Sequence, residues 1–158
     1  MAKPRMQPMV AHYVKLPKHP VAGWSVQCAI RMSMTLAHVG VYDSASYRRA
    51  GYATDQGWAL RAEDLYQWLR LKSSLGAAQI IRCTSYSQVP LDHGIVYLRN
   101  CWRRSRRART RTGDHIDFML WHKTGPRLLT AWRWPQDCSN DILYQCRDGK
   151  IRFWPCVW

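Results

Sequence analysis

At 158 residues the chain is long enough to bury a core without disulfide support, and we expect residues 1–158 to form one domain. Hydrophobic residues make up 47% of the sequence and aromatic residues 12%, a balance that argues against a disordered chain. The formal net charge is +14, so the expected partners are anionic: nucleic acid, an acidic glycopolymer, a membrane surface or an acidic protein.

The N-terminal segment, residues 1–22, is expected to be extended and irregular. Pro4, Pro8, Pro17 and Pro20 all disfavour a helix there. The segment lacks the continuous apolar core of a signal peptide, and the sequence contains no apolar run long enough for a membrane span. We therefore expect a protein that does not enter membranes and that is secreted, if at all, without a cleaved leader.

The segment 23–40, GWSVQCAIRMSMTLAHVG, predicts an amphipathic helix with a cysteine near its start. Ser25 is the expected N-cap, the helix should run to about Val39, and Gly40 is a natural stop. Cys28 would then occupy the third helical position. Free backbone N–H groups and the helix dipole favour a thiolate there, as at other reactive cysteines.

The remainder of the chain predicts helices first and strands afterwards. Residues 41–58 are polar and Gly-containing and predict a loop, whereas 62–76 predicts a second helix. The expected strands are 79–84, 94–101, 115–122, 128–134, 142–146 and 150–154. This order indicates an α+β fold in which N-terminal helices pack on an antiparallel β-sheet.

The cysteines do not predict a metal site. None of the six forms a CxxC pair, so neither a zinc ribbon nor a thioredoxin motif is supported, and no metal or cofactor is expected. A protein that works outside the cytoplasm could bridge some of them. The sequence leaves the pairing open among Cys83, Cys101, Cys138, Cys146 and Cys156.

A candidate base for Cys28 is His115, in TGDHIDFMLW at the start of an apolar strand. Asp117 lies two residues later and therefore points to the same face of the strand. A carboxylate there could accept a hydrogen bond from the imidazole and orient it, the third-member role of a catalytic triad. The alternative interpretation is a polar alternation on an edge strand. His93 is a rival base, but no acid lies two residues after it.

A cysteine at a helix start, followed by helices and then by a strand that opens with histidine, is the chain order of papain-like cysteine peptidases. The sequence resembles one such group, the fourth family of type VI secretion amidase effectors. The resemblance is carried by CAIRMSMTLAHVG (28–40), GIVYLRN (94–100), GDHIDFMLW (113–121) and KIRFWPCVW (150–158).

This resemblance implies a papain-like fold of the NlpC/CHAP type and an antibacterial toxin. Family members hydrolyse the bond between D-glutamate and meso-diaminopimelate in peptidoglycan stem peptides. They act in the periplasm or at the cell wall of a target bacterium, and a cognate immunity protein protects the producer. Carried over by motif, Cys28 is the nucleophile and His115 the general base.

The resemblance leaves two choices for the acid of the triad. In some members it lies two residues after the histidine, here Asp117, which we favour; in others it lies on the following strand, for which Asp137 is the alternative. Residues near the cysteine or in the leading segment are candidates for substrate or oxyanion contacts. These candidates are Gln27, Arg31, Trp24 and Tyr13.

The enzyme interpretation does not explain the basic loop at 102–112. Its core, RRSRRARTR (103–111), holds six arginines in nine residues and would suit phosphate contacts. The chain shows no recognisable nucleic-acid-binding motif, so we favour binding to the wall or docking of the immunity protein. A basic nucleic-acid-binding module and a catalytically inactive wall-binding relative remain the alternative functions.

Overall fold

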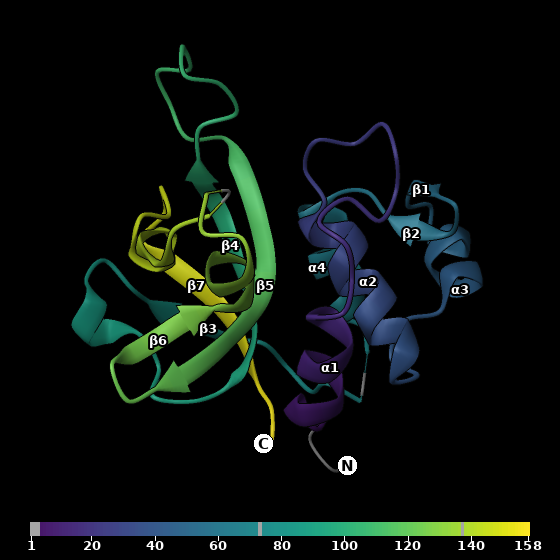
Figure 1. Cartoon of the computed structure of the whole chain (residues 1–158), viewed down its shortest axis with the longest axis horizontal. Helices are drawn as coiled ribbons and strands as arrows, with labels where there is room; N and C mark the ends of the chain where they lie inside the picture. The colour runs from purple at the N-terminus through teal and green to yellow at the C-terminus, as the bar shows by residue number, and fades with distance from the viewer. Residues whose placement is uncertain (1–3, 73, 137) are drawn as a thin grey trace.

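The computed structural model describes residues 4–72, 74–136 and 138–158. Four helices from the N-terminal half gather on one side of the molecule, and the main β-sheet forms the other side (Figure 1). These helices are α1 (Met6–Tyr13), α2 (Cys28–His38), α3 (Ser44–Arg49) and α4 (Ala62–Leu69). Among the described residues, no helix combines the length and the apolar character that crossing a membrane requires.

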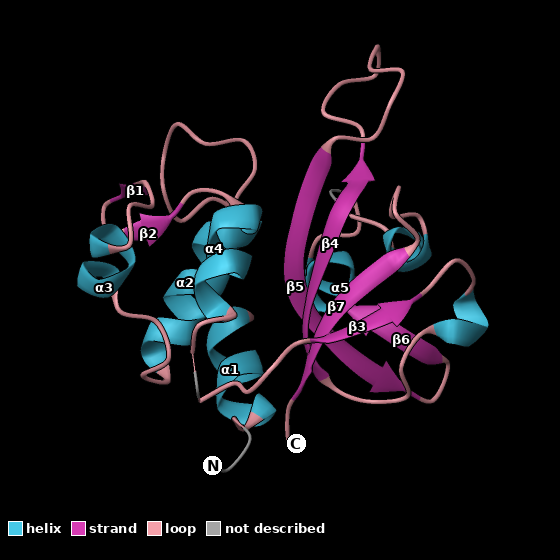
Figure 2. Cartoon of the chain, turned by 180° about the vertical axis from the view of Figure 1, so that it is seen from behind, coloured by secondary structure: helices cyan, strands magenta, loops and turns pink. Residues whose placement is uncertain are grey.

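The main sheet has five strands in the order β3-β7-β4-β5-β6, and every neighbouring pair is antiparallel. Its strands are β3 (Gln79–Arg82), β4 (Gly94–Trp102), β5 (Gly113–His122), β6 (Gly125–Leu128) and β7 (Lys150–Pro155). Helices therefore precede an antiparallel sheet, as the sequence predicts for an α+β fold. The loop between β4 and β5 projects from one end of the sheet (Figure 2).

The two faces of the sheet bury different cores. On β4, Ile95 and Tyr97 pack against the core shared with α1, α2 and α4, whereas Val96 and Leu98 pack into a second core on the opposite face. The second core is covered by α5 (Leu129–Arg133) and by the 3₁₀ helix η2 (Asn140–Tyr144). Because both faces of the sheet are covered, the first half of β4 is a continuous apolar run rather than an alternation of apolar and polar residues.

The prediction that residues 1–22 are entirely extended is wrong, because α1 forms within them. Pro8 occupies the first turn of α1, where a backbone N–H has no partner within the helix and its loss costs nothing. Met6, Met9 and Tyr13 on one face of α1 are fully buried. Burial of this face stabilises a short helix that composition alone disfavours.

The prediction of a plain loop at 41–58 is also wrong. Asp43 caps α3 by accepting hydrogen bonds from two backbone N–H groups of its first turn. A small hairpin of β1 (Thr54–Asp55) and β2 (Trp58–Ala59) follows, and its two turn residues have positive φ. Polar residues and glycine thus mark a capped helix and a tight turn here.

Two predicted strands are helical instead. Within 128–134 the chain leaves the sheet at Leu128 and forms α5, and within 142–146 it forms the end of η2. The Asp117 carboxylate accepts the N–H of Thr130 in the first turn of α5, and Ser139 caps η2. Short apolar runs do not distinguish a strand from a buried helical turn, so these side-chain bonds to the first turns decide the outcome.

The first predicted helix begins later than expected. Gln27, not Ser25, is the N-cap of α2, so Cys28 is the first helical residue rather than the third. The reason lies in the Gln27 side chain, which bonds back to the main chain of Val21 and Trp24 and holds the preceding segment in a loop. The second predicted helix, 62–76, ends earlier, because α4 stops at Leu69.

Candidate active site

The start of α2 faces the start of β5 across a cavity of about 320 Å³. Cys28 and His115 both line this cavity, and both are more than nine-tenths buried. As the first residue of α2, Cys28 lies where the backbone N–H groups have no partner within the helix and where the helix dipole favours negative charge. The fold therefore brings together the two residues that the sequence predicts as nucleophile and base.

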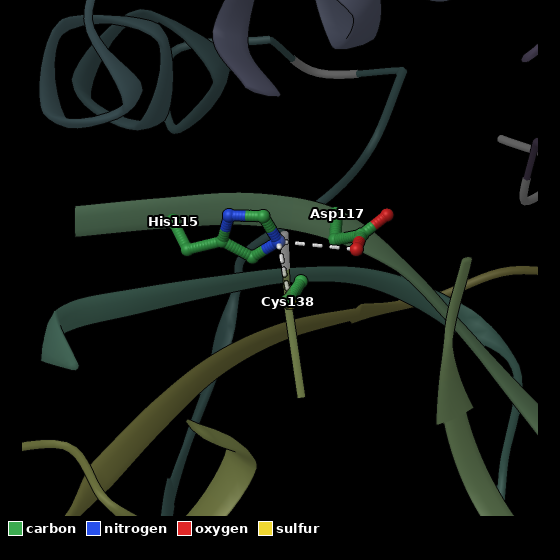
Figure 3. Close-up of side chains that lie close together, drawn as sticks. All are labelled: His115, Asp117 and Cys138. Carbon is green, nitrogen blue, oxygen red and sulfur yellow. Dashed lines mark hydrogen bonds and ion pairs between the residues drawn. The ribbon is translucent and has the colours of Figure 1, made fainter. Parts of the chain in front are cut away.

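Behind the imidazole lies a carboxylate from the same strand. His115 Nε2 and Asp117 Oδ2 are 3.1 Å apart, as the two-residue spacing on β5 predicts (Figure 3). Asp117 is fully buried and also accepts the N–H groups of Phe118 at 2.8 Å and Thr130 at 3.0 Å. These bonds fix the carboxylate and, through it, the ring orientation. Nε2 is the ring nitrogen that contacts Asp117, so in a triad of these residues Nδ1 would serve the thiol.

The electrostatics of the site favour a charged pair. Burial works against a charged His115, but its hydrogen bonds with Asp117, Cys138 and Cys28 raise its pKa well above the ordinary value. Burial likewise opposes the Cys28 thiolate, yet the hydrogen bond and charge of His115, with a backbone bond from Ile116, lower the thiol pKa. The two shifts have opposite directions, and both favour a thiolate–imidazolium pair over the neutral pair.

The alternative acid, Asp137, lies outside the described residues. The other predicted base, His93, accepts the N–H of Trp121 at 3.0 Å and packs against Trp158. It lines a separate cavity from that of Cys28. Among the described residues, Asp117 is thus the carboxylate in contact with His115.

Arg31 lines the cavity but is anchored within the protein. Its Nη1 donates to the carbonyl of Lys18 at 2.7 Å, and its Nε donates to the Tyr13 hydroxyl at 3.3 Å. The guanidinium also lies 4.3 Å from the ring centroid of Trp134. Arg31 therefore ties the loop before α2 to the rest of the helical side. Tyr13 is fully buried and supports this arginine from behind instead of forming the cavity wall.

The remaining two candidates, Gln27 and Trp24, precede the first residue of α2. The Gln27 side chain lines the cavity, and its amide nitrogen donates to the carbonyls of Val21 and Trp24. Because these bonds use both amide hydrogens, Gln27 positions the loop rather than supplying an oxyanion donor. Trp24 is 41% exposed, donates to Asp55, and lines a neighbouring cavity that also borders Cys28.

A residue that the sequence analysis did not place is Cys138, between α5 and η2. Its Sγ lies 3.9 Å from His115 Nε2, on the nitrogen that also contacts Asp117 (Figure 3). All six cysteines of the chain are free thiols in the structure. No spacing rule places Cys138 beside the imidazole, because the approach depends on how the chain turns after α5.

Comparison with known proteins agrees with this arrangement. No curated protein matches the chain. A family model described as Type VI secretion system (T6SS), amidase effector protein 4 matches residues 24–154, a span that includes α2, β5 and nearly all of β7. This match confirms the resemblance seen in the sequence. The chain belongs to the family of type VI secretion amidase effectors, group 4.

Proposed function

We propose that this amidase effector hydrolyses the bond between D-glutamate and meso-diaminopimelate in peptidoglycan stem peptides, with Cys28 as nucleophile. The observation that carries the mechanism is the Cys28–His115 pair, which shares one cavity and has pKa shifts toward thiolate and imidazolium. The identity of the bond rests on the family and on the segments that resemble it. The expected fold is papain-like, with 1–158 acting as one catalytic domain.

In the proposed mechanism the Cys28 thiolate attacks the carbonyl carbon of the scissile amide. The free backbone N–H groups at the start of α2 face the oxyanion that develops. His115, oriented by Asp117, protonates the leaving amine of diaminopimelate and then takes a proton from the water that cleaves the thioester. Every step is a proton transfer or an acyl transfer, for which the chain's own side chains suffice.

The bond specificity is tested with a purified disaccharide tetrapeptide, followed by mass spectrometry. We expect two products, a disaccharide that keeps L-alanine and D-glutamate, and a dipeptide of diaminopimelate and D-alanine. Free disaccharide with an intact peptide would instead show cleavage at the lactyl amide. Release of D-alanine alone would show a carboxypeptidase. Either of these outcomes would contradict the proposed bond.

The setting follows from the family. We propose delivery into the periplasm of a target bacterium and, in the producer, neutralisation by a cognate immunity protein. The net charge of +14 suits both an anionic wall and an acidic inhibitor. The basic loop is the most concentrated part of this charge. Its first residue, Trp102, lines the cavity that holds Cys28 and His115, so the loop begins at the wall of the site.

We propose that this loop holds the enzyme on the wall. Arg103, Arg106, Arg107 and Arg109 are exposed and form no ion pair with any described residue, so they are available to anionic groups. Changing all four to serine is expected to reduce sedimentation with purified sacculi by about tenfold at low salt, because several cationic contacts are lost together.

The loop variant should cleave the small soluble muropeptide within about twofold of wild type, since charge steering matters most for a large polyanion. Raising the salt should weaken wild-type binding to sacculi more than binding of the variant. Equal binding of both proteins to sacculi would contradict the role of the loop. A selective loss of duplex DNA binding, with sacculus binding intact, would favour the nucleic-acid alternative.

A further inference from the structure

The side chains of His115, Asp117 and Cys138 converge on one point. Their donor atoms lie within 4.8 Å of one another, with 3.1 Å between His115 Nε2 and Asp117 Oδ2 and 3.9 Å between Nε2 and Cys138 Sγ. Figure 3 shows the carboxylate and the ring directed toward each other, with the cysteine below the same nitrogen. The proposed triad consists of Cys28, His115 and Asp117 and does not include this thiol.

The geometry fits a tetrahedral zinc ion. With Zn–N and Zn–O bonds near 2.0–2.1 Å and a Zn–S bond near 2.3 Å, the ligand atoms of a tetrahedral site lie roughly 3.3–3.6 Å apart. The two separations from Nε2, 3.1 Å and 3.9 Å, bracket this range, and all three ligand atoms lie within 4.8 Å of one another, so small side-chain movements would bring them around the ion. Imidazole, carboxylate and thiolate together form a donor set that suits zinc better than magnesium or calcium.

The surroundings also suit a metal site. The backbone N–H groups of Phe118 and Thr130 fix the Asp117 carboxylate, which is the role of outer partners in known sites. His115 and Cys138 both line the 320 Å³ cavity, which provides an entry path and room for a water as fourth ligand.

We propose that His115, Asp117 and Cys138 bind Zn²⁺ and that the bound ion switches off hydrolysis. Binding displaces the protons of the Cys138 thiol and of His115 Nε2 into solvent, so no oxidant or reductant takes part. With Nε2 on the metal, Nδ1 keeps a hydrogen that is far less acidic than that of an imidazolium. His115 then cannot protonate the leaving amine. The binding part stands on the cluster alone, whereas the inhibition part rests on the proposed function.

The binding part is tested on the full chain carrying Cys28→Ala, which removes the other cavity thiol. Titration with zinc against a chromophoric chelator should show one site. Adding Cys138→Ser should lower the zinc affinity of that site by at least about tenfold, because one of its three protein ligands is lost. The cobalt(II) form should show thiolate-to-metal charge-transfer absorption that disappears with Cys138→Ser.

The matched control is Cys146→Ser, a buried thiol in the second core that takes no part in the cluster. It should leave both the affinity and the cobalt spectrum unchanged. Absence of saturable binding, binding indifferent to Cys138→Ser, or binding lost with Cys146→Ser instead would each overturn the site.

The inhibition part is tested on the protein with Cys28 intact. Zinc should inhibit muropeptide cleavage, a chelator should restore it, and Cys138→Ser should raise the half-inhibitory zinc concentration by the factor found for binding. Zinc binding without inhibition of cleavage would contradict the inhibitory role of the ion but would still support the zinc site. A protein that cleaves no muropeptide at all would instead contradict the proposed function, and the binding titration would still decide the site.

Discussion

Changing Cys28 to alanine is expected to lower kcat/KM for muropeptide cleavage by at least about 10⁴-fold, because the proposed acyl intermediate forms on this thiol. The thiol lies at the first position of α2 and lines the same cavity as His115, whose charge lowers the thiol pKa. The measurement is the initial rate of product formation, followed by chromatography, for both proteins under identical conditions.

Two further variants make this result specific. Cys28→Ser keeps a nucleophilic atom whose proton is far harder to remove, so we expect it to be nearly as inactive as alanine. Cys146→Ala removes a thiol from the second core, on the opposite face of the sheet, and should retain the wild-type rate per folded molecule. Circular dichroism on all variants verifies the fold. A Cys28→Ala protein with a tenth of wild-type activity would rule out Cys28 as the nucleophile.

The sequence is informative about the centre of this site because the relevant signals are local. The apolar periodicity after Cys28 predicts a helix with the thiol near its start, and the two-residue spacing of His115 and Asp117 predicts a shared strand face. Both features are present in the structure. The error at the helix start, Ser25 instead of Gln27, arises because the Gln27 side chain bonds to the preceding loop. No N-cap preference encodes that contact.

The surroundings of the site were less predictable because they depend on tertiary packing. α1 forms despite Pro8, since its apolar face is buried against the helical core. α5 forms where a strand is expected, because Asp117 accepts an N–H from its first turn. Cys138 contacts His115 across a sequence separation of 23 residues, so the contact depends on how the chain packs in three dimensions. Propensity and periodicity are weak in such short segments, so contacts distant in sequence decide their structure.

Changing Asp117 to asparagine is expected to lower kcat/KM at neutral pH by roughly 10²–10⁴-fold, as for the orienting acid of other triads. Asparagine keeps the shape but removes the charge that stabilises the imidazolium. It can also present an N–H to Nε2, which selects the wrong tautomer. The variant should therefore lose both the orientation and the protonation of His115.

The pH profile distinguishes this role from a purely structural one. In the proposed mechanism the active form carries a Cys28 thiolate and a protonated His115, so activity declines at low pH as the thiolate gains a proton and at high pH as the imidazolium loses one. The Asp117 hydrogen bond raises the His115 pKa. Its removal lowers that pKa, and the alkaline limb of kcat/KM should move to lower pH. Asp141→Asn, at an exposed carboxylate bonded to Tyr144, should leave the profile unchanged.

The same experiment decides between the two candidate acids. If Asp137 orients the imidazole, Asp137→Asn will shift the alkaline limb of kcat/KM. Asp117→Asn will then lower the thermal stability but leave the alkaline limb where it is. Some loss of stability is expected from Asp117→Asn in either case, because the carboxylate also holds the N–H groups of Phe118 and Thr130. The position of the limb, not the melting temperature, is therefore the decisive observable. It reports the protonation of His115 directly, whereas stability reports every bond that Asp117 makes.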